Sequence, residues 1–487
     1  MTLNLSEIKN LAKNYPIFPL STEIFADLKT PISVLKTLKS ISSCCFLLES
    51  INNNENWGRY SFLGFDPLTE IKCKNGKLSI TNGTAVTIET GNPNQYIRDI
   101  LTQYQSPILP NLPPFTGGLV GYFAYNYIKY AEPNLNLNHS IENPFNDVDL
   151  MLFDKIIAFD HQKQKIFIIV NFKTDDLEEN YNRALLQLEQ LTALIKTPTP
   201  KISSNAQLLT PFQAEFSQEE YCAIVDKAKH YITEGDIFQV VPSNCRTAKF
   251  SGSLLNTYRV LRTTNPSPYM FYLSGHDLEV AGASPETLIK LQNGILSTSP
   301  IAGTKPRGKT IEEDLAFEQD LLHNTKERAE HDMLVDLGRN DLGKISKFGS
   351  VKLKHYQQIR RYSHVMHLTS TITGLIKENS DALDAILATL PAGTLSGAPK
   401  IRAIEIIHEL EKSPRGLYGG TIGYLDFTGN MDVCIAIRMA VKKANKVYIR
   451  SGGGIVAASN PIEEYQESLN KAQAIIDAVL QSQEVLD

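Results

Sequence analysis

The stretch VDLMLFDKIIAFD (residues 148–160), closely followed by KIFIIV (165–170), decides the fold of the N-terminal part of this chain. Both segments hold short apolar runs separated by turn residues, a pattern typical of strands rather than helices. Earlier segments have the same character, namely CCFLLES (44–50), RYSFLGF (59–65), LSITNG (78–83) and GGLVGYFAY (117–125). We therefore expect a sheet-rich unit from Tyr15 to about Val170.

The length of the chain, 487 residues, exceeds the roughly 250 to 300 at which single cores stop growing. After a helical pattern from Asp176 to about Ile195, the segment KTPTPKISSNAQLLTPFQ (196–213) lacks periodicity and is rich in Pro, Ser and Thr. We place a linker at 196–215. It divides an N-terminal region, 15–195, from a C-terminal catalytic region, 216–480.

The C-terminal region mixes helices and strands. The segment 217–235 opens with Ser217 and Glu220, a capping-box pair, and predicts a helix. Apolar spacing predicts further helices at 311–337, 381–390, 399–411 and 462–480, and strands at 278–284, 365–374, 421–427, 433–444 and 446–454. The expected class is α/β, of the α+β kind: a large two-layer sandwich of antiparallel sheets with helices outside, in which the two regions interleave.

Composition narrows the class of protein. A net charge of -5 argues against general nucleic-acid binding, which needs clustered Lys and Arg. Six cysteines without a CxxC pair predict neither a disulfide framework nor a zinc site, so we expect reduced, mostly buried thiols. The N-terminus lacks the apolar core of a signal peptide, and no apolar run reaches the length of a membrane span. These features predict a cytoplasmic enzyme with a small-molecule substrate and no membrane association.

A phosphate-loop pattern occurs at Gly303–Thr310, GTKPRGKT. We reject it as a nucleotide site, because Pro306 removes one of the backbone N–H groups that such a loop offers to phosphates. The segment MLVD, which ends at Asp336 and would have to be the metal-binding strand, has helical apolar spacing.

Two pairs of glutamates indicate a metal. Glu327 and Glu330 are three residues apart on one expected helix, and Glu464 and Glu467 are three apart on another. Each pair shows both carboxylates on one helix face, and oxygen ligands of this kind suit Mg²⁺. Taken alone, the pairs are better explained as solvated helix faces, since surface helices are routinely rich in Glu.

Two neighbouring features favour an anionic ligand. Gly452 to Gly454 end an expected strand, where a ligand can approach the backbone closely. Arg438 lies in the apolar stretch VCIAIRMAV, where a buried guanidinium would need an anion or a structural carboxylate.

Six motifs in order complete the pattern: PIAGTKPRG (300–308), KERAEHDMLVDLGRND (326–341), YSHVMHLTS (362–370), LPAGTLSGAPK (390–400), GLYGGTIGY (416–424) and IRSGGGIV (449–456). Together they resemble the chorismate-utilising enzymes, and among these component I of anthranilate synthase, over about Tyr15 to Ala478. The resemblance implies the chorismate-utilising enzyme fold. It also implies a Mg²⁺-dependent lyase that converts chorismate and ammonia to anthranilate and pyruvate through aminodeoxyisochorismate, the first step of tryptophan biosynthesis.

The same resemblance assigns roles to residues. It implies that Glu330 and Glu467 bind Mg²⁺ directly and that Glu327 and Glu464 hold its waters. It implies chorismate contacts at Gly303, Thr304, Thr394, Tyr418, Arg438, Gly452, Gly453 and Gly454. Glu286 matches the general acid that protonates the leaving C4 hydroxyl, a role that requires a raised pKa. His367 matches the histidine of pyruvate elimination, and Thr394 completes the catalytic set.

Two positions separate the subfamilies. Isochorismate and salicylate synthases carry a water-activating Lys where this chain has Gln239, and aminodeoxychorismate synthases carry a nucleophilic Lys where this chain has Ala302. An Ala cannot form a covalent intermediate, which favours direct attack of ammonia at C2. Aminodeoxychorismate synthase component I is the nearest alternative, and a catalytically silent tryptophan-binding subunit is the alternative outside the enzymes.

Two further expectations concern partners. LLES, which ends with Glu49 and Ser50, resembles the family's tryptophan-feedback motif, and Pro268, Tyr269 and Met270 match its partner segment. Glu49 and Ser50 are expected to receive the amino group of tryptophan, and Tyr269 and Met270 to pack on its indole. The chain has no Gly-x-Cys-x-Gly turn of a glutamine amidotransferase, so we expect a separate amidotransferase subunit, component II, to supply ammonia from glutamine.

Overall fold

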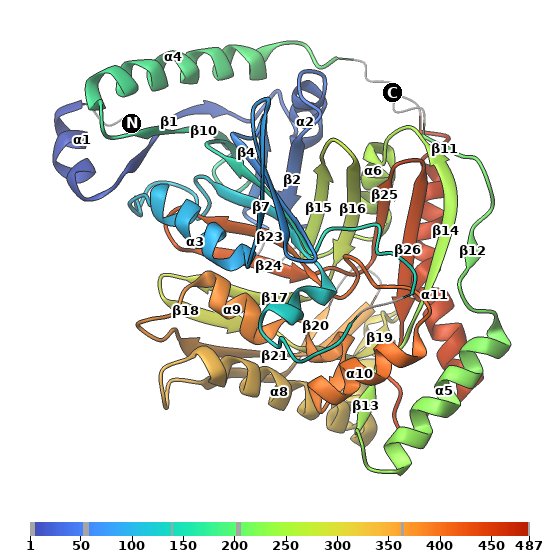
Figure 1. Cartoon of the computed structure of the whole chain (residues 1–487). Helices are drawn as coiled ribbons and strands as arrows, with labels where there is room; N and C mark the ends of the chain where they lie inside the picture. Colours follow the sequence, from blue (N-terminus) through green and yellow to red (C-terminus); the bar gives the residue numbers. More distant parts are fainter. Residues whose placement is uncertain (1–4, 52–57, 138–139, 201–205, 362–364, 486–487) are drawn as a thin grey trace.

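The computed structural model describes residues 5–51, 58–137, 140–200, 206–361 and 365–485, with the side chains of Ser6 and Thr304 left undescribed. Two 12-stranded sheets and one two-stranded sheet are formed within these residues. All strand pairs between neighbours in the two large sheets are antiparallel, and helices cover their outer faces (Figure 1). The predicted antiparallel sandwich flanked by helices is confirmed.

The first large sheet combines strands from both ends of the chain. Its spatial order is β1 (Ile17–Phe25), β10 (Lys165–Lys173), β9 (Lys155–Asp160), β3 (Tyr60–Phe65), β2 (Cys45–Glu49), β15 (Tyr269–Ser274), β16 (Leu278–Ser284), β25 (Met439–Lys443), β26 (Lys446–Gly452), β14 (Ser243–Ser251) and β11 (Gln207–Leu208), with β12 (Gln213–Ala214) also on β14.

The second large sheet is equally mixed in sequence. Its order is β19 (Ile301–Pro306), β21 (Val365–Leu375), β18 (Ile295–Thr298), β17 (Thr287–Gln292), β24 (Met431–Ile435), β23 (Thr421–Asp426), β7 (Gly118–Phe123), β8 (Val148–Phe153), β4 (Thr69–Lys74), β5 (Lys77–Asn82) and β6 (Ala85–Thr90), with β20 (Lys352–Arg361) also on β21. The small sheet pairs β13 (Gln239–Val240) with β22 (Gly397–Ala398).

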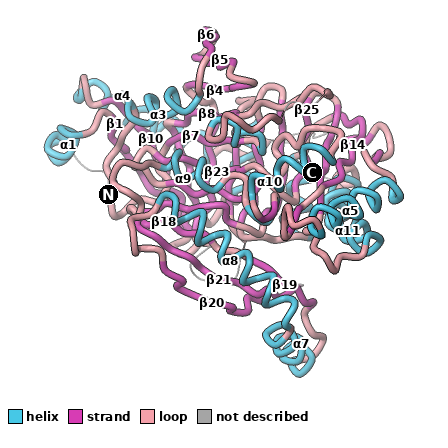
Figure 2. Tube along the Cα trace, turned by 60° about the horizontal axis from the view of Figure 1, so that its bottom comes forward, coloured by secondary structure: helices cyan, strands magenta, loops and turns pink. Residues whose placement is uncertain are grey.

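The apolar runs of the sequence are continuous because both faces of these strands are buried. In β10, Phe167 and Ile169 pack in the core between the sheets, whereas Ile166, Ile168 and Val170 pack under the helices on the outside. The helices are α1 (Leu5–Leu11), α2 (Pro31–Lys39), α3 (Pro93–Gln103), α4 (Leu177–Lys196), α5 (Gln218–Thr233), α6 (Leu255–Thr264), α7 (Ile311–His323), α8 (Thr325–Ile345), α9 (Ala382–Thr389), α10 (Lys400–Leu410) and α11 (Pro461–Gln481), with 3-10 turns η1 (Ala12–Asn14), η2 (Tyr125–Tyr130) and η3 (Gly393–Leu395). In Figure 2, α5 lies beside α11, and α7 projects from the body of the molecule.

Two predicted elements are corrected. The single helix expected at 311–337 is two helices, because Asn324 ends α7 and its side chain accepts hydrogen bonds from the first N–H groups of α8. The single strand expected at 433–444 is also broken. β24 belongs to the second sheet and β25 to the first, and the chain crosses between the sheets over residues 436–438. The strand β20 was not predicted.

The segment expected as a linker contributes the short strands β11 and β12, which pair with β14. The proposed boundary at 196–215 remains a prediction, since strands from both of its sides share each large sheet. The capping box of Ser217 and Glu220 is confirmed at the start of α5.

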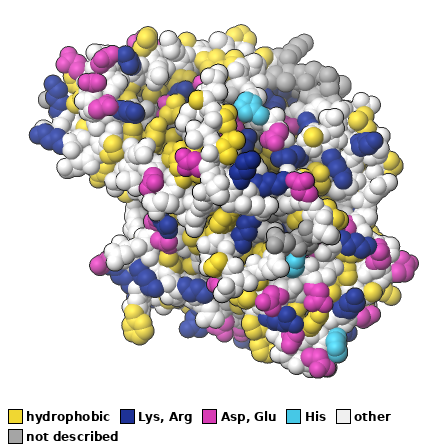
Figure 3. Space-filling view, in the orientation of Figure 1, with side chains coloured by type: hydrophobic (Ala, Val, Ile, Leu, Met, Phe, Trp, Pro, Cys, Tyr) yellow, Lys and Arg dark blue, Asp and Glu magenta, His cyan; other side chains and the backbone are white. Residues whose placement is uncertain are grey.

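The surface and the cysteines agree with the composition. All six cysteines are free thiols, and five of them are buried, as predicted. On the face shown in Figure 3, acidic and basic side chains are interspersed. Among the described helices, none combines the length and the apolar character needed to cross a membrane.

Candidate active site

A cavity of about 590 Å³ gathers most of the residues that the sequence singled out. Its walls come from the end of β26, from β19, from η3 and from the first turns of α8 and α11. The predicted residues that line it are Glu286, His367, Thr394, Gly303, Tyr418, Arg438, Gly452, Gly453, Gly454, Glu327, Glu330, Glu464 and Glu467. Thr304 lies on the same strand, β19, and its side chain is outside the described part of the structure.

Arg438 enters the cavity because the chain changes sheets beside it. Its backbone adopts a left-handed conformation with φ of 51°, a strained geometry for a residue with a side chain. Its carbonyl accepts a hydrogen bond of 3.0 Å from the N–H of Ala283, which fixes the crossing against β16. The expectation of a buried guanidinium inside a strand is wrong: Arg438 is exposed to the cavity, where it can meet an anionic ligand.

Glu286 has the properties of an acid catalyst. It follows the end of β16 and is 9% exposed. Burial raises the pKa of its carboxyl to about 8, although the Thr394 hydroxyl, 3.4 Å away, and the Arg438 charge both lower it. A carboxyl with this pKa is mostly protonated at neutral pH, so it can donate a proton to a leaving group.

His367 on β21 is held as a neutral imidazole. Its Nδ1 lies 3.2 Å from the carbonyl oxygen of Gly303, and because a carbonyl only accepts, Nδ1 carries the proton. Burial, and then the charge of Arg438, lower the pKa of the ring to about 4 against that hydrogen bond. His367 therefore presents Nε2 as a proton acceptor at neutral pH.

Gly303 occupies a position that requires glycine. Its φ of 69° is left-handed, and a Cβ there would lie 2.9 Å from Glu327 Oε2 and 2.9 Å from a methyl group of Leu321. The absence of a side chain lets β19 approach α8 and aim the Gly303 carbonyl at His367.

The four glutamates are positioned by two helix N-termini. Asn324 accepts from the N–H groups of Lys326 and Glu327, and Asn460 accepts from those of Ile462 and Glu463, so each Glu pair falls in the first two turns. The positive end of a helix favours carboxylates there. Helices α8 and α11, which are far apart in the sequence, thus present both pairs to one cavity.

The carboxylates influence one another across the helices. Burial raises the pKa of Glu330, and the charges of Glu327 on its own helix and Glu467 on α11 raise it further. Oxygen-only donors that repel each other at a cavity wall fit a hard divalent cation such as Mg²⁺. The residues present therefore fit the magnesium that the family resemblance implies.

The sequence reasoning missed two cations at this site. Lys326 and Lys471 line the cavity, lower the pKa of Glu330, and in the case of Lys471 form an ion pair of 2.6 Å with Glu467. The spacing of Glu467 and Lys471, four residues apart on a helix, would have revealed the second of them.

The glycine run and Tyr418 form a further part of the cavity wall. A Cβ on Gly452 would lie 2.2 Å from the carbonyl oxygen of Pro242 on the neighbouring chain segment, so the tight pairing of β26 and β14 requires glycine there. Tyr418 is 5% exposed, and the Gly452 backbone lowers the pKa of its hydroxyl. Burial raises its pKa to about 12, which keeps the hydroxyl protonated as a donor.

Both positions that distinguish the subfamilies also face this cavity. Ala302 and Gln239 line it, and Gln239 is 4% exposed. Gln239 Oε1 is a buried acceptor with no hydrogen-bond partner among the described residues. A buried carbonyl oxygen of this kind is costly unless a ligand supplies a donor.

Two backbone N–H groups near the end of the rejected phosphate loop already have carboxylate partners. The N–H of Gly308 donates to Asp314 at 2.9 Å, and that of Lys309 donates to Glu313 at 2.8 Å. The segment that ends at Asp336 is helical, as predicted.

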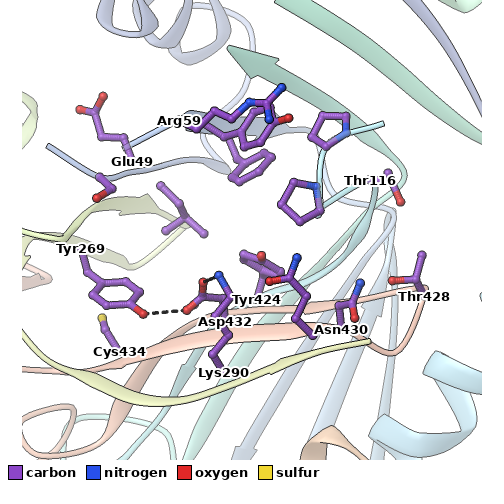
Figure 4. A pocket seen from close by; sticks show the side chains of 18 of the residues that line it. Glu49, Arg59, Thr116, Tyr269, Lys290, Tyr424, Thr428, Asn430, Asp432 and Cys434 are labelled. Carbon is purple, nitrogen blue, oxygen red and sulfur yellow. Dashed lines mark hydrogen bonds and ion pairs between the residues drawn. The ribbon is translucent and has the colours of Figure 1, made fainter. Parts of the chain in front are cut away.

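A second cavity, of about 580 Å³, lies between the sheets and is lined by all five residues predicted for tryptophan. Glu49 does not point into it: its carboxylate accepts from Arg262 at 2.7 Å and from Tyr258 at 2.6 Å on α6, and Figure 4 shows it turned away from Tyr269 and Asp432. In this geometry Arg262 and Tyr258 hold the Glu49 carboxylate, and its expected role of receiving an amino group stays a prediction.

The expected contact of Met270 with an indole also stays a prediction. Consecutive side chains of a strand point to opposite faces, and Met270 packs under the helices with the outer core, whereas Tyr269 faces the cavity. Tyr269 donates to Asp432 at 2.8 Å, and Ser50 Oγ is buried without a hydrogen-bond partner among the described residues. The cavity therefore offers Ser50, Pro268 and Tyr269, together with an ion pair of 2.9 Å between Asp432 and Lys290.

Comparisons with known proteins agree with these features. The family model for chorismate binding enzyme matches residues 43–477. Anthranilate synthase component 1 of Acetivibrio thermocellus is 45% identical over 493 residues, covering 99% of each chain. The Acinetobacter calcoaceticus protein of the same name is 46% identical, over 96% of this chain and 95% of its own. The crystal structure of anthranilate synthase component I from Streptococcus pneumoniae superposes with a TM-score of 0.77 at 35% identity, over 93% of this chain and 98% of its own.

The match extends over nearly the whole chain, which includes both cavities, and the three relatives named above are each called anthranilate synthase component 1 or I. The chain belongs to the chorismate-binding enzymes and, within them, to the family of anthranilate synthase component 1.

Proposed function

We propose that the chain converts chorismate and ammonia to anthranilate and pyruvate, with Mg²⁺ as its metal and aminodeoxyisochorismate as the intermediate. The observation that carries this proposal is the cavity that combines a protonated Glu286, a neutral His367 and four glutamates on its wall. The names of the relatives support the reaction, and the absence of a lysine at Gln239 and Ala302 supports ammonia as the direct nucleophile.

In the first half-reaction, a bond forms between the ammonia nitrogen and C2 of chorismate, and the bond from C4 to its hydroxyl breaks. Hydroxide is a poor leaving group, so Glu286 donates its proton and the hydroxyl departs as water. Thr394 holds the Glu286 carboxyl at 3.4 Å. Arg438 supplies a positive charge to a carboxylate of the substrate.

In the second half-reaction, the proton on C2 is removed and the bond from C3 to the enolpyruvyl oxygen breaks, so that the ring becomes aromatic. The departing enolpyruvate gains a proton on its methylene carbon and leaves as pyruvate. His367 suits the proton removal, because Nδ1–H is bonded to Gly303 and the neutral ring has no proton on Nε2, which can therefore act as a base. Glu330 and Glu467 would hold Mg²⁺, with Glu327 and Glu464 on its waters, and the ion would bind and polarise a substrate carboxylate.

Gln239 is positioned to bind the ammonia nucleophile. Its buried Oε1 can accept a hydrogen bond from ammonia, whose lone pair then remains available for attack. A lysine at this position would instead serve to activate water. Aminodeoxychorismate synthase, the nearest alternative, forms its covalent intermediate through a nucleophilic Lys. This chain has Ala302 at that position and cannot form the intermediate.

We expect the purified chain to form anthranilate from chorismate, Mg²⁺ and ammonium, and to form none when glutamine replaces ammonium. The reason is that the sequence contains no amidotransferase nucleophile. Anthranilate fluorescence in parallel assays checks this. In a further assay, addition of a glutamine amidotransferase subunit, component II, should restore the use of glutamine. Glutamine-dependent product from the chain alone would overturn the proposed need for a partner.

We further propose that the second cavity binds tryptophan as a feedback inhibitor, which fits a first-step enzyme of its biosynthesis. Its wall has apolar area for an indole from Pro268 and Tyr269, and polar groups for the amino acid at Ser50 and Asp432. Glu49 supports this wall from behind, since four donor atoms of Tyr258, Arg262 and Ser61 fix it at the end of β2.

The substitution Ser50→Ala is expected to weaken tryptophan inhibition by about 10-fold, because a hydrogen bond to a charged group is worth about 1.5 kcal/mol or more. The measurement is the tryptophan concentration that halves the rate of each variant relative to its own uninhibited rate. Thr263→Ala, on the exposed end of α6, is the matched control and retains wild-type inhibition. Equal inhibition of Ser50→Ala and wild type would remove Ser50 from the ligand contacts.

A further inference from the structure

A second cluster of metal-ligating side chains lies outside both cavities. Cys44 stands directly before β2, Glu70 lies on β4, and His276 lies in the turn between β15 and β16. One potential ligand atom from each of the three side chains lies within 4.8 Å of the other two. Cys44 and Glu70 are buried, at 3% and 6% exposure, and His276 opens the cluster to solvent.

The distances approach those of a tetrahedral zinc site. Cys44 Sγ is 3.7 Å from Glu70 Oε1, and His276 Nε2 is 2.9 Å from the same oxygen. With metal bonds of about 2.3 Å to sulfur and about 2.0 Å to nitrogen and oxygen, tetrahedral ligands stand roughly 3.3 to 3.6 Å apart. These two separations need to change by only a few tenths of an ångström. Movement of the exposed His276 ring can shorten the third separation, between His276 Nε2 and Cys44 Sγ.

Neighbouring groups orient the ligand atoms. Lys72 binds the other carboxylate oxygen, Glu70 Oε2, at 3.0 Å, so Oε1 alone faces Cys44 and His276. Ser43 Oγ is 3.2 Å from His276 Nδ1, which leaves Nε2 for the cluster. Partners on the far side of each ligand are characteristic of built metal sites, where they fix ring and carboxylate orientation.

We propose that Cys44, Glu70 and His276 bind one divalent transition-metal ion of the zinc type, with a solvent molecule as the fourth ligand. A thiolate and an imidazole select such ions over Mg²⁺, so this site is chemically distinct from the glutamates of the first cavity. The proposal does not depend on the proposed function.

The site would join the two large sheets. Cys44 and His276 adjoin strands of the first sheet, β2, β15 and β16, and Glu70 belongs to the second sheet through β4. The strands β2 and β15 also carry Ser50 and Tyr269, which line the second cavity. Metal binding to the folded chain then stabilises the contact between the sheets beside that cavity.

The test uses Co²⁺ as a spectroscopic probe on the full-length protein in an excess of Mg²⁺. We expect one equivalent of Co²⁺ to produce a thiolate-to-metal absorption band in the near ultraviolet that Zn²⁺ abolishes by displacement. Cys44→Ser should lose the band. His276→Ala should weaken binding by at least about 10-fold, since even loss of an outer partner costs about 10- to 100-fold. Cys222→Ser, which alters a more accessible thiol on α5, should leave the band and the affinity unchanged.

Three results would overturn the site: no band in the wild type, a band that survives in Cys44→Ser, or an unchanged affinity in His276→Ala. His276 is exposed, so that variant tests the site even where Cys44→Ser fails to fold.

Discussion

The substitution Glu286→Gln is expected to lower the turnover number by about 10²- to 10⁴-fold at saturating chorismate, ammonium and Mg²⁺. Gln has nearly the same shape as a protonated Glu and can still accept from Thr394, but it cannot give up a proton to the departing hydroxyl. The steady-state rate of anthranilate formation measures the effect. Glu219→Gln, on the exposed start of α5, is the matched control and retains the wild-type rate.

The pH profile separates an acid from a structural carboxyl. Because burial raises the pKa of Glu286 to about 8, the active protonated form prevails below that pH and is lost as the pH rises through it. At constant free ammonia, wild-type kcat/KM should therefore fall on the alkaline side, and Glu286→Gln should lack that fall. An unchanged turnover number in Glu286→Gln would remove it from the acid role.

The substitution Glu330→Gln is expected to reduce kcat/KM for chorismate by at least about 100-fold at low Mg²⁺ and to raise the Mg²⁺ concentration needed for half activity. Mg²⁺ is usually held by only one or two protein carboxylates, so loss of one of two direct ligands removes a large part of the binding energy. Titration of activity with Mg²⁺ measures both quantities. Excess Mg²⁺ should restore part of the rate, because the variant keeps the amide oxygen.

Glu312→Gln provides the comparison for this variant. Glu312 lies in the first turn of α7 and is exposed, so the same change there should leave the Mg²⁺ dependence as in the wild type. Wild-type Mg²⁺ dependence in Glu330→Gln would contradict the assignment of the glutamates to the metal and would favour solvated helix faces.

The sequence predicted the class of fold because its strands repeat one simple pattern. Runs such as 148–160 and 165–170 are apolar throughout, and the structure buries both faces of β8, β9 and β10. Two of the predicted helices also begin where expected, with the side chains of Ser217 and Asp381 as their N-caps. The break at Asn324 was missed, since an Asn inside a helical apolar pattern signals a cap only when a second helix follows it.

That the site residues lie together in one cavity could be inferred only from the family motifs. Glu286, His367 and Arg438 are far apart in sequence and meet because β16, β21 and the crossing at 436–438 end at one cavity. Periodicity could not reveal that crossing, since VCIAIRMAV is apolar on both sides of it. The opposite orientations of Tyr269 and Met270 could have been inferred, because consecutive strand residues face opposite sides.

Several properties of the site residues follow from packing and could not be inferred from their place in the sequence. Lys326 and Lys471 matter through their position beside carboxylates of two helices, and Gln239 matters through an acceptor that the fold leaves buried. Lys326 and Glu467 lie on different helices, so their proximity depends on packing that local sequence pattern does not reveal, whereas Lys471 and Glu467 are four residues apart on one helix.

The most direct test of the proposed reaction is the identity of the product formed from chorismate and ¹⁵N-ammonium by the purified chain with Mg²⁺. Chromatography with mass detection should show 2-aminobenzoate that carries one ¹⁵N atom, together with an equal amount of pyruvate. An aminated product at C4, or a hydroxylated product without ¹⁵N, would contradict direct attack of ammonia at C2 and with it the proposed function.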